Sequence, residues 1–124
     1  MSIVALDLEA TCWSEDDDPE LRERQREESE IIEIGAVKLD SDTLEPVGEF
    51  THFVRPVRHP TLSDFCQTLT TISQQDVDAA QPFTQTFEAF VEWMGGQTEG
   101  VTLVSWGRYD HNQLCRECER AGLP

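Results

Sequence analysis

Two acidic residues, Asp7 and Glu9, follow a short apolar run near the start of the chain. Residues 2–8 are typical of a buried strand, and residues two apart in a strand point to the same face. Neighbouring carboxylates at the end of such a strand repel each other and lose solvation, and a divalent cation removes that cost. Oxygen ligands suit Mg²⁺ or Mn²⁺, so the pair predicts a metal site. The same spacing also occurs on exposed strands that bind nothing, and that alternative stays open.

A third carboxylate, Asp110, ends the segment Ser-Trp-Gly-Arg-Tyr-Asp. The segment overlaps a second apolar run, residues 101–106, which we predict to be another buried strand. Asp110 falls where a helix is expected to begin, so one interpretation is a capping aspartate that the helix dipole stabilises. The other is that Asp110 meets Asp7 and Glu9 at the ends of neighbouring strands, as a third metal ligand.

The rest of the pattern predicts the elements that would position these acids. Residues 31–39 and 47–55 are rich in β-formers and flank a turn, which indicates an antiparallel hairpin. Helices are expected over residues 62–69, 73–79, 84–94 and 110–121. The order of strand, hairpin, helices, strand and helix is typical of an α/β domain with a mixed sheet.

Composition restricts the class of protein. A chain of 124 residues fits one domain, and a hydrophobic fraction of 38% is that of a globular protein. No stretch approaches the ~20 apolar residues of a membrane span. The first apolar run has no basic residue before it and is interrupted by Asp7, so we expect no signal peptide and an intracellular, cytoplasmic location. The four cysteines are therefore expected to be reduced.

The charge is strongly negative, −16, from 25 acids against 9 bases. Nine of those acids, with three arginines, lie in residues 14–30, which we interpret as an acidic surface insertion with a charged helical part. Such a charge argues against tight, sequence-blind binding of duplexes. It remains compatible with an enzyme whose metal ions contact the phosphates and that holds only a few nucleotides.

Several segments together resemble a known family. Residues 7–12 (Asp-Leu-Glu-Ala-Thr-Cys) resemble the first motif of the DEDD superfamily of 3'–5' exonucleases, in its DEDDh branch, and residues 105–110 resemble the second. Residues 53–56 and 62–73 are similar to the subgroup that trims histone messenger RNA ends and small RNAs. The resemblance covers nearly the whole chain except the acidic insertion. It implies a ribonuclease H-like fold, an α/β mixed sheet with flanking helices.

The resemblance also implies a reaction. Asp7, Glu9 and Asp110 would hold two Mg²⁺ or Mn²⁺ ions ~3.5–4 Å apart, which stabilise the attacking and leaving oxygens. Water would hydrolyse the last phosphodiester of single-stranded RNA or DNA at its 3' end and release a nucleoside 5'-monophosphate. The backbone of Ala10 would meet the terminal sugar. The terminal bases would pack on the side chains of Trp13, Leu69 and Tyr109. Partial core packing is the alternative role for the two aromatic residues.

The sequence departs from the family pattern in two places. Thr71 stands where the family often has glycine. The family's third motif, a histidine that acts as general base and an aspartate that completes the metal ligands, has no counterpart in residues 1–124. We therefore expect a single exonuclease-like domain whose C-terminal unit is missing and whose activity is impaired. His111 is a candidate substitute base, although it points ~100° around a helix from Asp110, and a surface histidine is its simpler role.

Two rival functions stay open. One is a catalytically inactive relative that binds single-stranded nucleic acid or a protein partner. The other is an acidic regulatory domain with a structural zinc at Cys115 and Cys118. Structural zinc needs four ligands, and two cysteines three residues apart on a helix are more typical of packed thiols.

Overall fold

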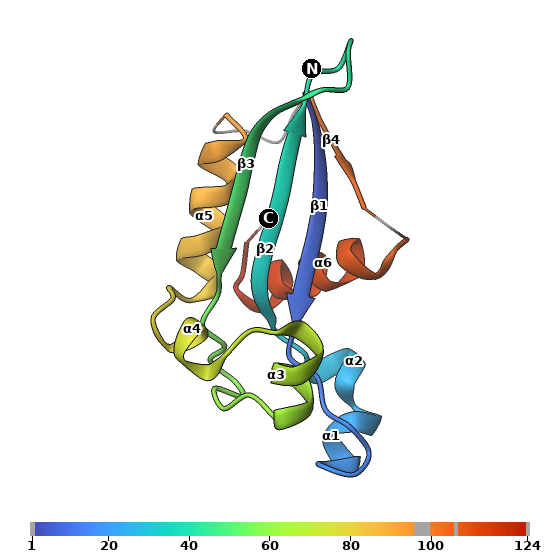
Figure 1. Cartoon of the computed structure of the whole chain (residues 1–124), viewed down its shortest axis with the longest axis vertical. Helices are drawn as coiled ribbons and strands as arrows, with labels where there is room; N and C mark the ends of the chain where they lie inside the picture. Colours follow the sequence, from blue (N-terminus) through green and yellow to red (C-terminus); the bar gives the residue numbers. More distant parts are fainter. Residues whose placement is uncertain (1, 96–99, 106, 124) are drawn as a thin grey trace.

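The computed structural model of the chain describes residues 2–95, 100–105 and 107–123 (Figure 1). Its elements are, in chain order, β1 (Ser2–Ala10), α1 (Pro19–Glu23), α2 (Gln25–Glu28), β2 (Ile31–Leu39), β3 (Pro46–Phe53), α3 (Asp64–Thr70), α4 (Gln74–Asp78), α5 (Phe83–Trp93), β4 (Val101–Val104) and α6 (Tyr109–Arg120). Trp106, the end of the last predicted strand, lies outside the described residues. None of the described helices is long and apolar enough to cross a membrane.

The strands form a mixed sheet, as predicted, in the order β3-β2-β1-β4. β1 and β2 pair antiparallel, as do β2 and β3, and the predicted hairpin is therefore confirmed. β4 pairs parallel with β1 over Ser2 to Ala5 only. The second half of β1 consequently has no strand on that side among the described residues, and the candidate acids lie in this half.

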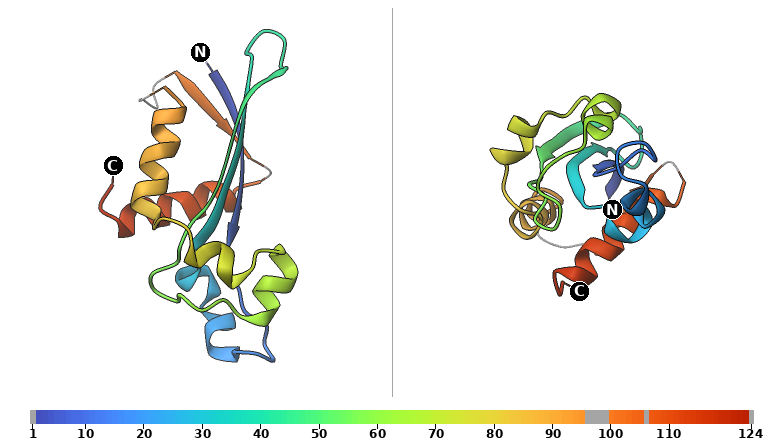
Figure 2. Two further views of the ribbon diagram at one scale, coloured as in Figure 1. Left: turned by 60° about the vertical axis from the view of Figure 1, so that its left-hand side comes forward. Right: turned by 90° about the horizontal axis from the view of Figure 1, so that it is seen from below.

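The two long helices, α5 and α6, lie on the same face of the sheet (Figure 2). The alternate residues Val4, Leu6 and Leu8 of β1 are buried toward this face and share one core with Phe90 and Met94 of α5. Burial of this apolar surface is the main favourable term for the sheet and its helices. The opposite face carries no helix over most of its length in the part of the chain that the structure describes (Figures 1 and 2).

The prediction of a buried last strand is wrong. Leu103 and Val104 of β4 are 44% and 47% exposed. β4 is short and lies at the edge of the sheet, so an apolar run here does not mean that both faces are covered. The apolar run identified the strand but not its position in the sheet.

A second core holds the end of β1 against α3 and α4. It is built from Cys12, Ile32, Leu62, Cys66, Ile72 and Val77. Cys115, by contrast, is exposed, so the prediction that both helix thiols are packed is wrong for this residue. All four cysteines are free thiols, as expected.

The acidic segment 14–30 is helical in part, and its second half is anchored to the chain beside β1. The hydroxyl of Ser29 donates to the carbonyl oxygen of Thr11 at 2.8 Å, and the backbone N–H of Glu30 donates to the Thr11 hydroxyl at 2.9 Å. The backbone N–H of Trp13 donates to Oε1 of Gln25 at 2.9 Å. The segment is therefore fixed directly beside the residues that follow Glu9.

Candidate active site

Asp7 and Glu9 lie on the face of β1 opposite the core that β1 shares with α5. Their neighbours Leu6, Leu8 and Ala10 are buried on the other face, because side chains alternate along a strand. Asp7 is exposed and Glu9 is partly buried. Burial raises the pKa of Glu9 above its ordinary value, and the negative charges of the surrounding acids raise it further.

One of those acids, Glu33, was not singled out from the sequence. It lies directly opposite Glu9 in the antiparallel pair of β1 and β2. Burial raises the pKa of Glu33, and the charges of Asp7 and Asp76 add to this rise. Like charges directly opposite each other destabilise a sheet, which is a cost without a cation. The detectable signal was a lone acid within the apolar run Ile-Ile-Glu-Ile of the next strand.

Gly35 lies opposite Asp7 and leaves room beside it. A Cβ atom at Gly35 would come to 3.3 Å from the carbonyl oxygen of Asp7, so a larger residue would force the two strands to adjust. A hollow of about 340 Å³ is lined by Asp7 and Gly35 together with Thr51 of β3. This hollow is open space in which a group bound at Asp7 could lie.

Asp110 reaches the same half of β1 from α6. It occupies the first turn of that helix, and Arg108 is the N-cap residue without a side-chain cap bond, so the capping interpretation is wrong. The carboxylate is buried. Burial raises its pKa, the charge of Asp7 raises it further, and a hydrogen bond from the backbone of Leu8 acts in the opposite direction.

The structure thus brings the three predicted acids within electrostatic range of one another and adds a fourth. The carboxylate cluster consists of Asp7, Glu9, Glu33 and Asp110. None of its members forms an ion pair with a described basic residue. The all-oxygen donor set fits Mg²⁺ or Mn²⁺ by its chemistry. Within residues 2–95, 100–105 and 107–123, however, no three His, Cys, Asp or Glu side chains are arranged so that they could hold a metal ion.

The predicted nucleotide-binding residues differ in accessibility. Leu69 and Tyr109 are 65% and 54% exposed, so both can contact a ligand. Trp13 is only 5% exposed, and its ring meets the ring of His59 edge-on at 5.2 Å between centroids. Ala10 is buried at the end of β1, and its carbonyl oxygen lies 3.9 Å from the sulfur of Cys66. The core-packing alternative therefore describes Trp13 better than Tyr109.

Thr71, where the family often has glycine, ends α3 in the left-handed conformation with φ of 62°. That region is readily accessible to glycine and strained for a β-branched residue. The structure therefore gives a physical reason for the family's preference. Thr71 lies two residues beyond the exposed Leu69, so the strain is local to this part of the candidate site.

His111 is exposed, and its Nε2 lies 3.7 Å from the sulfur of Cys115 on the next turn. This contact holds the ring on the surface of α6, as the simpler interpretation predicted. No third metal-ligating side chain joins this pair among the described residues, so the zinc alternative gains no support.

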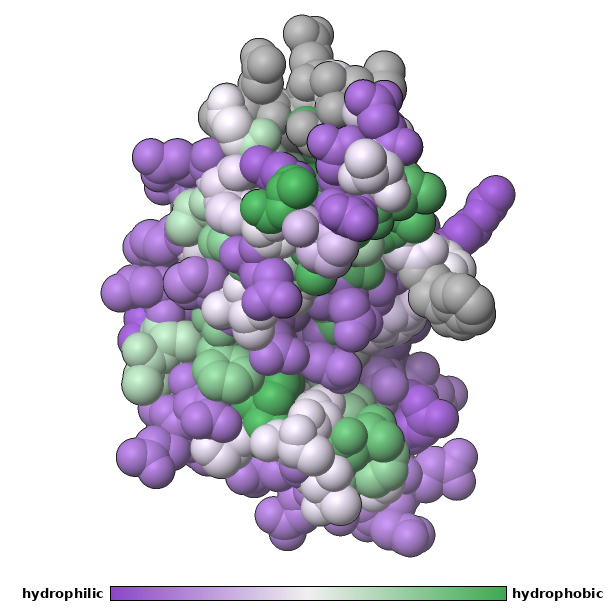
Figure 3. All heavy atoms as spheres, turned by 45° about the horizontal axis from the view of Figure 1, so that its top comes forward, coloured by the Kyte–Doolittle hydropathy of each residue, from purple (hydrophilic) through white to green (hydrophobic). Residues whose placement is uncertain are grey.

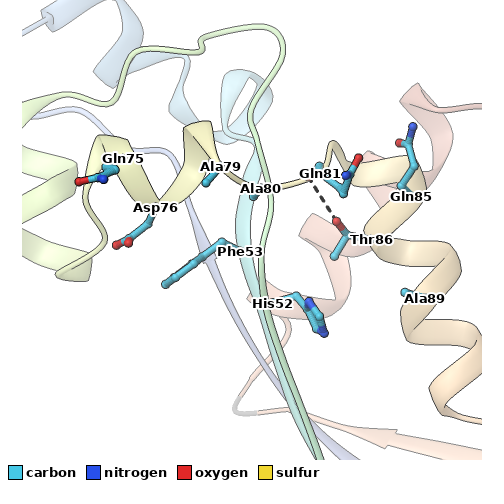
Figure 4. A pocket seen from close by; sticks show the side chains of 10 residues that line it. All are labelled: His52, Phe53, Gln75, Asp76, Ala79, Ala80, Gln81, Gln85, Thr86 and Ala89. Atoms are coloured by element: carbon cyan, nitrogen blue, oxygen red, sulfur yellow. Dashed lines mark hydrogen bonds between the residues drawn. The ribbon is translucent and has the colours of Figure 1, made fainter.

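A separate hollow of about 600 Å³ lies between β3, α4 and α5 (Figure 4). Its lining is mostly alanine and glutamine, with His52, Phe53 and Asp76 at one side. It includes none of the predicted site residues. The surface of the molecule is otherwise largely hydrophilic, with scattered apolar side chains, on the face shown in Figure 3.

Comparison with known proteins shows which family the chain resembles. Residues 4–120 match the family described as Exonuclease, of the RNase T type. The human 3'-5' exoribonuclease 1 is 41% identical over an alignment of 126 residues, which covers 98% of this chain and 34% of that protein. The chain spans about half or less of the length of the curated relatives that it matches.

Solved structures agree. The nuclease domain of 3'hExo, a DEDDh family member bound to rAMP, is 35% identical with a TM-score of 0.83, over 99% of this chain and 60% of that one. A structure of 3'-end recognition of the histone mRNA stem-loop by 3'-exonuclease is 34% identical with a TM-score of 0.81, over 97% of this chain and 52% of that one. The predicted ribonuclease H-like fold is therefore confirmed.

Proposed function

The chain belongs to the exonuclease family of the RNase T type, and from that premise we propose that it hydrolyses the terminal phosphodiester at the 3' end of single-stranded nucleic acid. The predicted resemblance to the DEDDh exonucleases that act on histone messenger RNA is confirmed. The observation that carries the proposal is that Asp7 and Glu9 share one face of β1 and that the buried Asp110 lies in the first turn of α6, beside the same half of this strand. RNA is the favoured substrate, because the similar human protein is an exoribonuclease.

The residues of this chain would divide the work. Asp7, Glu9 and Asp110 would hold a pair of Mg²⁺ or Mn²⁺ ions, whose chemistry is to lower the pKa of a bound water and to neutralise charge on the leaving oxygen. The exposed side chains of Leu69 and Tyr109 would contact the terminal bases. Trp13, which is buried, would pack beneath the surface that these side chains form. The backbone of Ala10 would face the terminal sugar.

We expect residues 1–124 alone to turn over slowly. The family's third motif has no counterpart in this sequence, and general-base assistance contributes ~10²–10⁴-fold to a rate. The second candidate function is a binding module without catalysis. It is favoured by the observation that the described carboxylates are not arranged as a ready metal site.

The test is a 3'-labelled oligonucleotide incubated with the chain in Mn²⁺, in Mg²⁺ and in excess chelator. We expect slow release of labelled mononucleotide that needs the metal and is abolished by Asp7→Asn. The matched control is Asp16→Asn, which removes the same charge from the exposed insertion. Activity that survives both the chelator and Asp7→Asn would refute the proposed mechanism. Tight binding without any cleavage would favour the binding module.

A further inference from the structure

A further pocket, of about 480 Å³, lies between the acidic insertion and the first half of α6. Three arginines line it: Arg22 and Arg26 from the insertion, and Arg116 from α6. They are one third of the nine basic residues of the chain. Glu23 is the one carboxylate in the described lining. An insertion with a strongly negative net charge therefore contributes two positive charges to this pocket.

The three pocket arginines make no ion pair with the described acids. Other arginines do: Arg24 and Arg58 pair with Glu28, and Arg120 pairs with Glu117. In a chain with 25 acids, an arginine has many possible partners. A group of cations that faces one pocket without such partners is suited to an anion from outside the chain.

Arg116 is held in place by the protein. Its Nη2 donates to Oε1 of Gln113 at 2.9 Å, and Nε2 of the fully buried Gln113 donates to the carbonyl oxygen of Ser29 at 3.0 Å. The Nε atom of Arg116 is buried without a hydrogen-bond partner among the described residues. The guanidinium is thus oriented in advance where it lines the pocket, which favours binding of a phosphate there.

The pocket borders the carboxylate cluster. Tyr109 lines it and is followed directly by Asp110. Burial raises the pKa of Tyr109, and the nearby positive charge of Arg116 opposes that rise. Gln25, another lining residue, accepts the hydrogen bond from the backbone of Trp13. The positive pocket is therefore continuous with the residues proposed to hold the terminal nucleotide.

We propose that Arg22, Arg26 and Arg116 bind a phosphodiester of the single-stranded substrate, on the strand that leads away from the terminal nucleotide. The inference rests on the proposed function, because it takes the end of the strand to lie at the carboxylate cluster. The local positive charge offsets the repulsion between a polyanion and a chain of charge −16. It also gives the acidic insertion a role in binding.

The test measures binding of a 5'-fluorescent single-stranded RNA oligonucleotide by anisotropy, in chelator so that no cleavage occurs, across a salt series. We expect Arg116→Gln and the double variant Arg22→Gln/Arg26→Gln each to weaken binding by about three- to tenfold. Each lost phosphate contact should also reduce the salt slope by ~0.7. The matched control is Arg24→Gln, which removes the same charge from the same insertion but lies outside the pocket lining and is paired with Glu28.

Competition distinguishes the phosphate of the terminal nucleotide from a phosphodiester further along the strand. AMP should displace the oligonucleotide equally well from the wild type and from the pocket variants, because a nucleotide held at the carboxylate cluster does not reach the arginines. Displacement that depends on the pocket arginines would instead assign the pocket to the terminal phosphate and overturn the inference. Equal weakening in Arg24→Gln, or no binding of the oligonucleotide at all, would also overturn it.

Two further controls keep the outcomes distinct. Thermal melting shows whether Arg116→Gln still folds. If this variant does not fold, the double variant Arg22→Gln/Arg26→Gln gives the test, because both of these arginines are exposed. Failure of the proposed function has a different signature, namely no metal-dependent cleavage in the wild type although the oligonucleotide binds. Cleavage by the wild type combined with unchanged binding in both pocket variants would refute this inference alone.

Discussion

Two groups of acids in this molecule differ in what surrounds their oxygens. The first group, the anchoring acids, consists of Glu30 and Glu117. The carboxylate of Glu30 accepts the backbone N–H groups of Val57, Arg58 and His59 at 2.7–3.0 Å. Glu117 accepts the backbone N–H of Ile31 at 2.8 Å. Both acids hold backbone N–H groups of other segments by hydrogen bonds, so their role is structural.

The carboxylate cluster is the opposite case. The neighbours of its members are mainly other carboxylates. Glu9 lies opposite Glu33 in the strand pair, and Asp110 approaches from α6. Asp110 has the one backbone hydrogen bond that lowers a pKa in the cluster, from Leu8. The fold holds these acids together at a cost that no described basic residue offsets through an ion pair, which is expected where a bound cation completes the site.

A raised pKa does not separate the two groups. Burial raises the pKa of Glu117 as it does that of Glu9 and Asp110. The balance of partners separates them. Glu117 has a backbone donor and a nearby Arg120, whereas the charges that shift the pKa of Glu9 are all negative. Asp110 lies between the two cases, with one backbone donor beside its acidic neighbour. The partners of a buried acid are therefore a better guide to its role than its burial.

The largest expected change in stability comes from removing an anchoring acid. Glu30→Ala removes the charged acceptor of three backbone N–H groups, and a hydrogen bond to a charged group contributes ~1.5–3 kcal/mol. We expect the free energy of unfolding to fall by about 3 kcal/mol or more, measured by urea denaturation. Glu88→Ala on the exposed side of α5 is the control and should cost under about 0.5 kcal/mol. A loss for Glu30→Ala no greater than the control would remove the distinction between the groups.

The next effect concerns the cluster and its cation. Mg²⁺ or Mn²⁺ should stabilise the wild type, by about 1.4 kcal/mol at ten times the dissociation constant, because a ligand that binds only the folded state adds its binding free energy. Asp7→Asn should lose most of this gain, while its stability without metal should equal or slightly exceed that of the wild type. Thermal melting across a metal titration measures both. Equal stabilisation of the two proteins by metal would exclude Asp7 as a ligand.

The sequence predicted the elements of the fold well where local pattern decides them. The bounds of β2 match the predicted residues 31–39, because an apolar run followed by a turn sets both ends. The aromatic face of α5 was also correct, since Phe90 and Met94 lie in the core. The position of β4 at the sheet edge depends on which strands pair, and no local pattern specifies that.

The site was predictable in its motif residues and less so in its surroundings. Asp7 and Glu9 could be placed on one face from their spacing alone. Glu33 could not, because its proximity to Glu9 depends on the register between two strands. The pocket formed with Arg116 was missed for a similar reason, since Arg22 and Arg26 are 90 or more residues away and looked like part of a solvated charged segment.

The smallest expected effect tests the repulsion within the cluster directly. The pKa of Glu33 is raised above its ordinary value of 4.5, first by burial and then by neighbouring acids. A carboxyl group whose pKa is raised by folding favours the folded state below the ordinary value, and this contribution is lost as pH rises through the raised pKa. Glu33→Gln stays neutral at every pH. It should therefore match the wild type near pH 4 and exceed its stability by about 0.5 kcal/mol at pH 7.

Urea denaturation of the two proteins at both pH values, in chelator, measures this difference. Glu49→Gln on the exposed side of β3 is the control, because its cross-strand partner is the uncharged Val37 and its removal relieves no opposing acid. Added metal should reverse the order at pH 7, since a cation at the cluster turns the repulsion of Glu9 and Glu33 into attraction for the ion. A gain for Glu33→Gln that is the same at pH 4 and pH 7 would mean that packing, and not charge, sets the cost. Glu33 would then not belong with the carboxylate cluster.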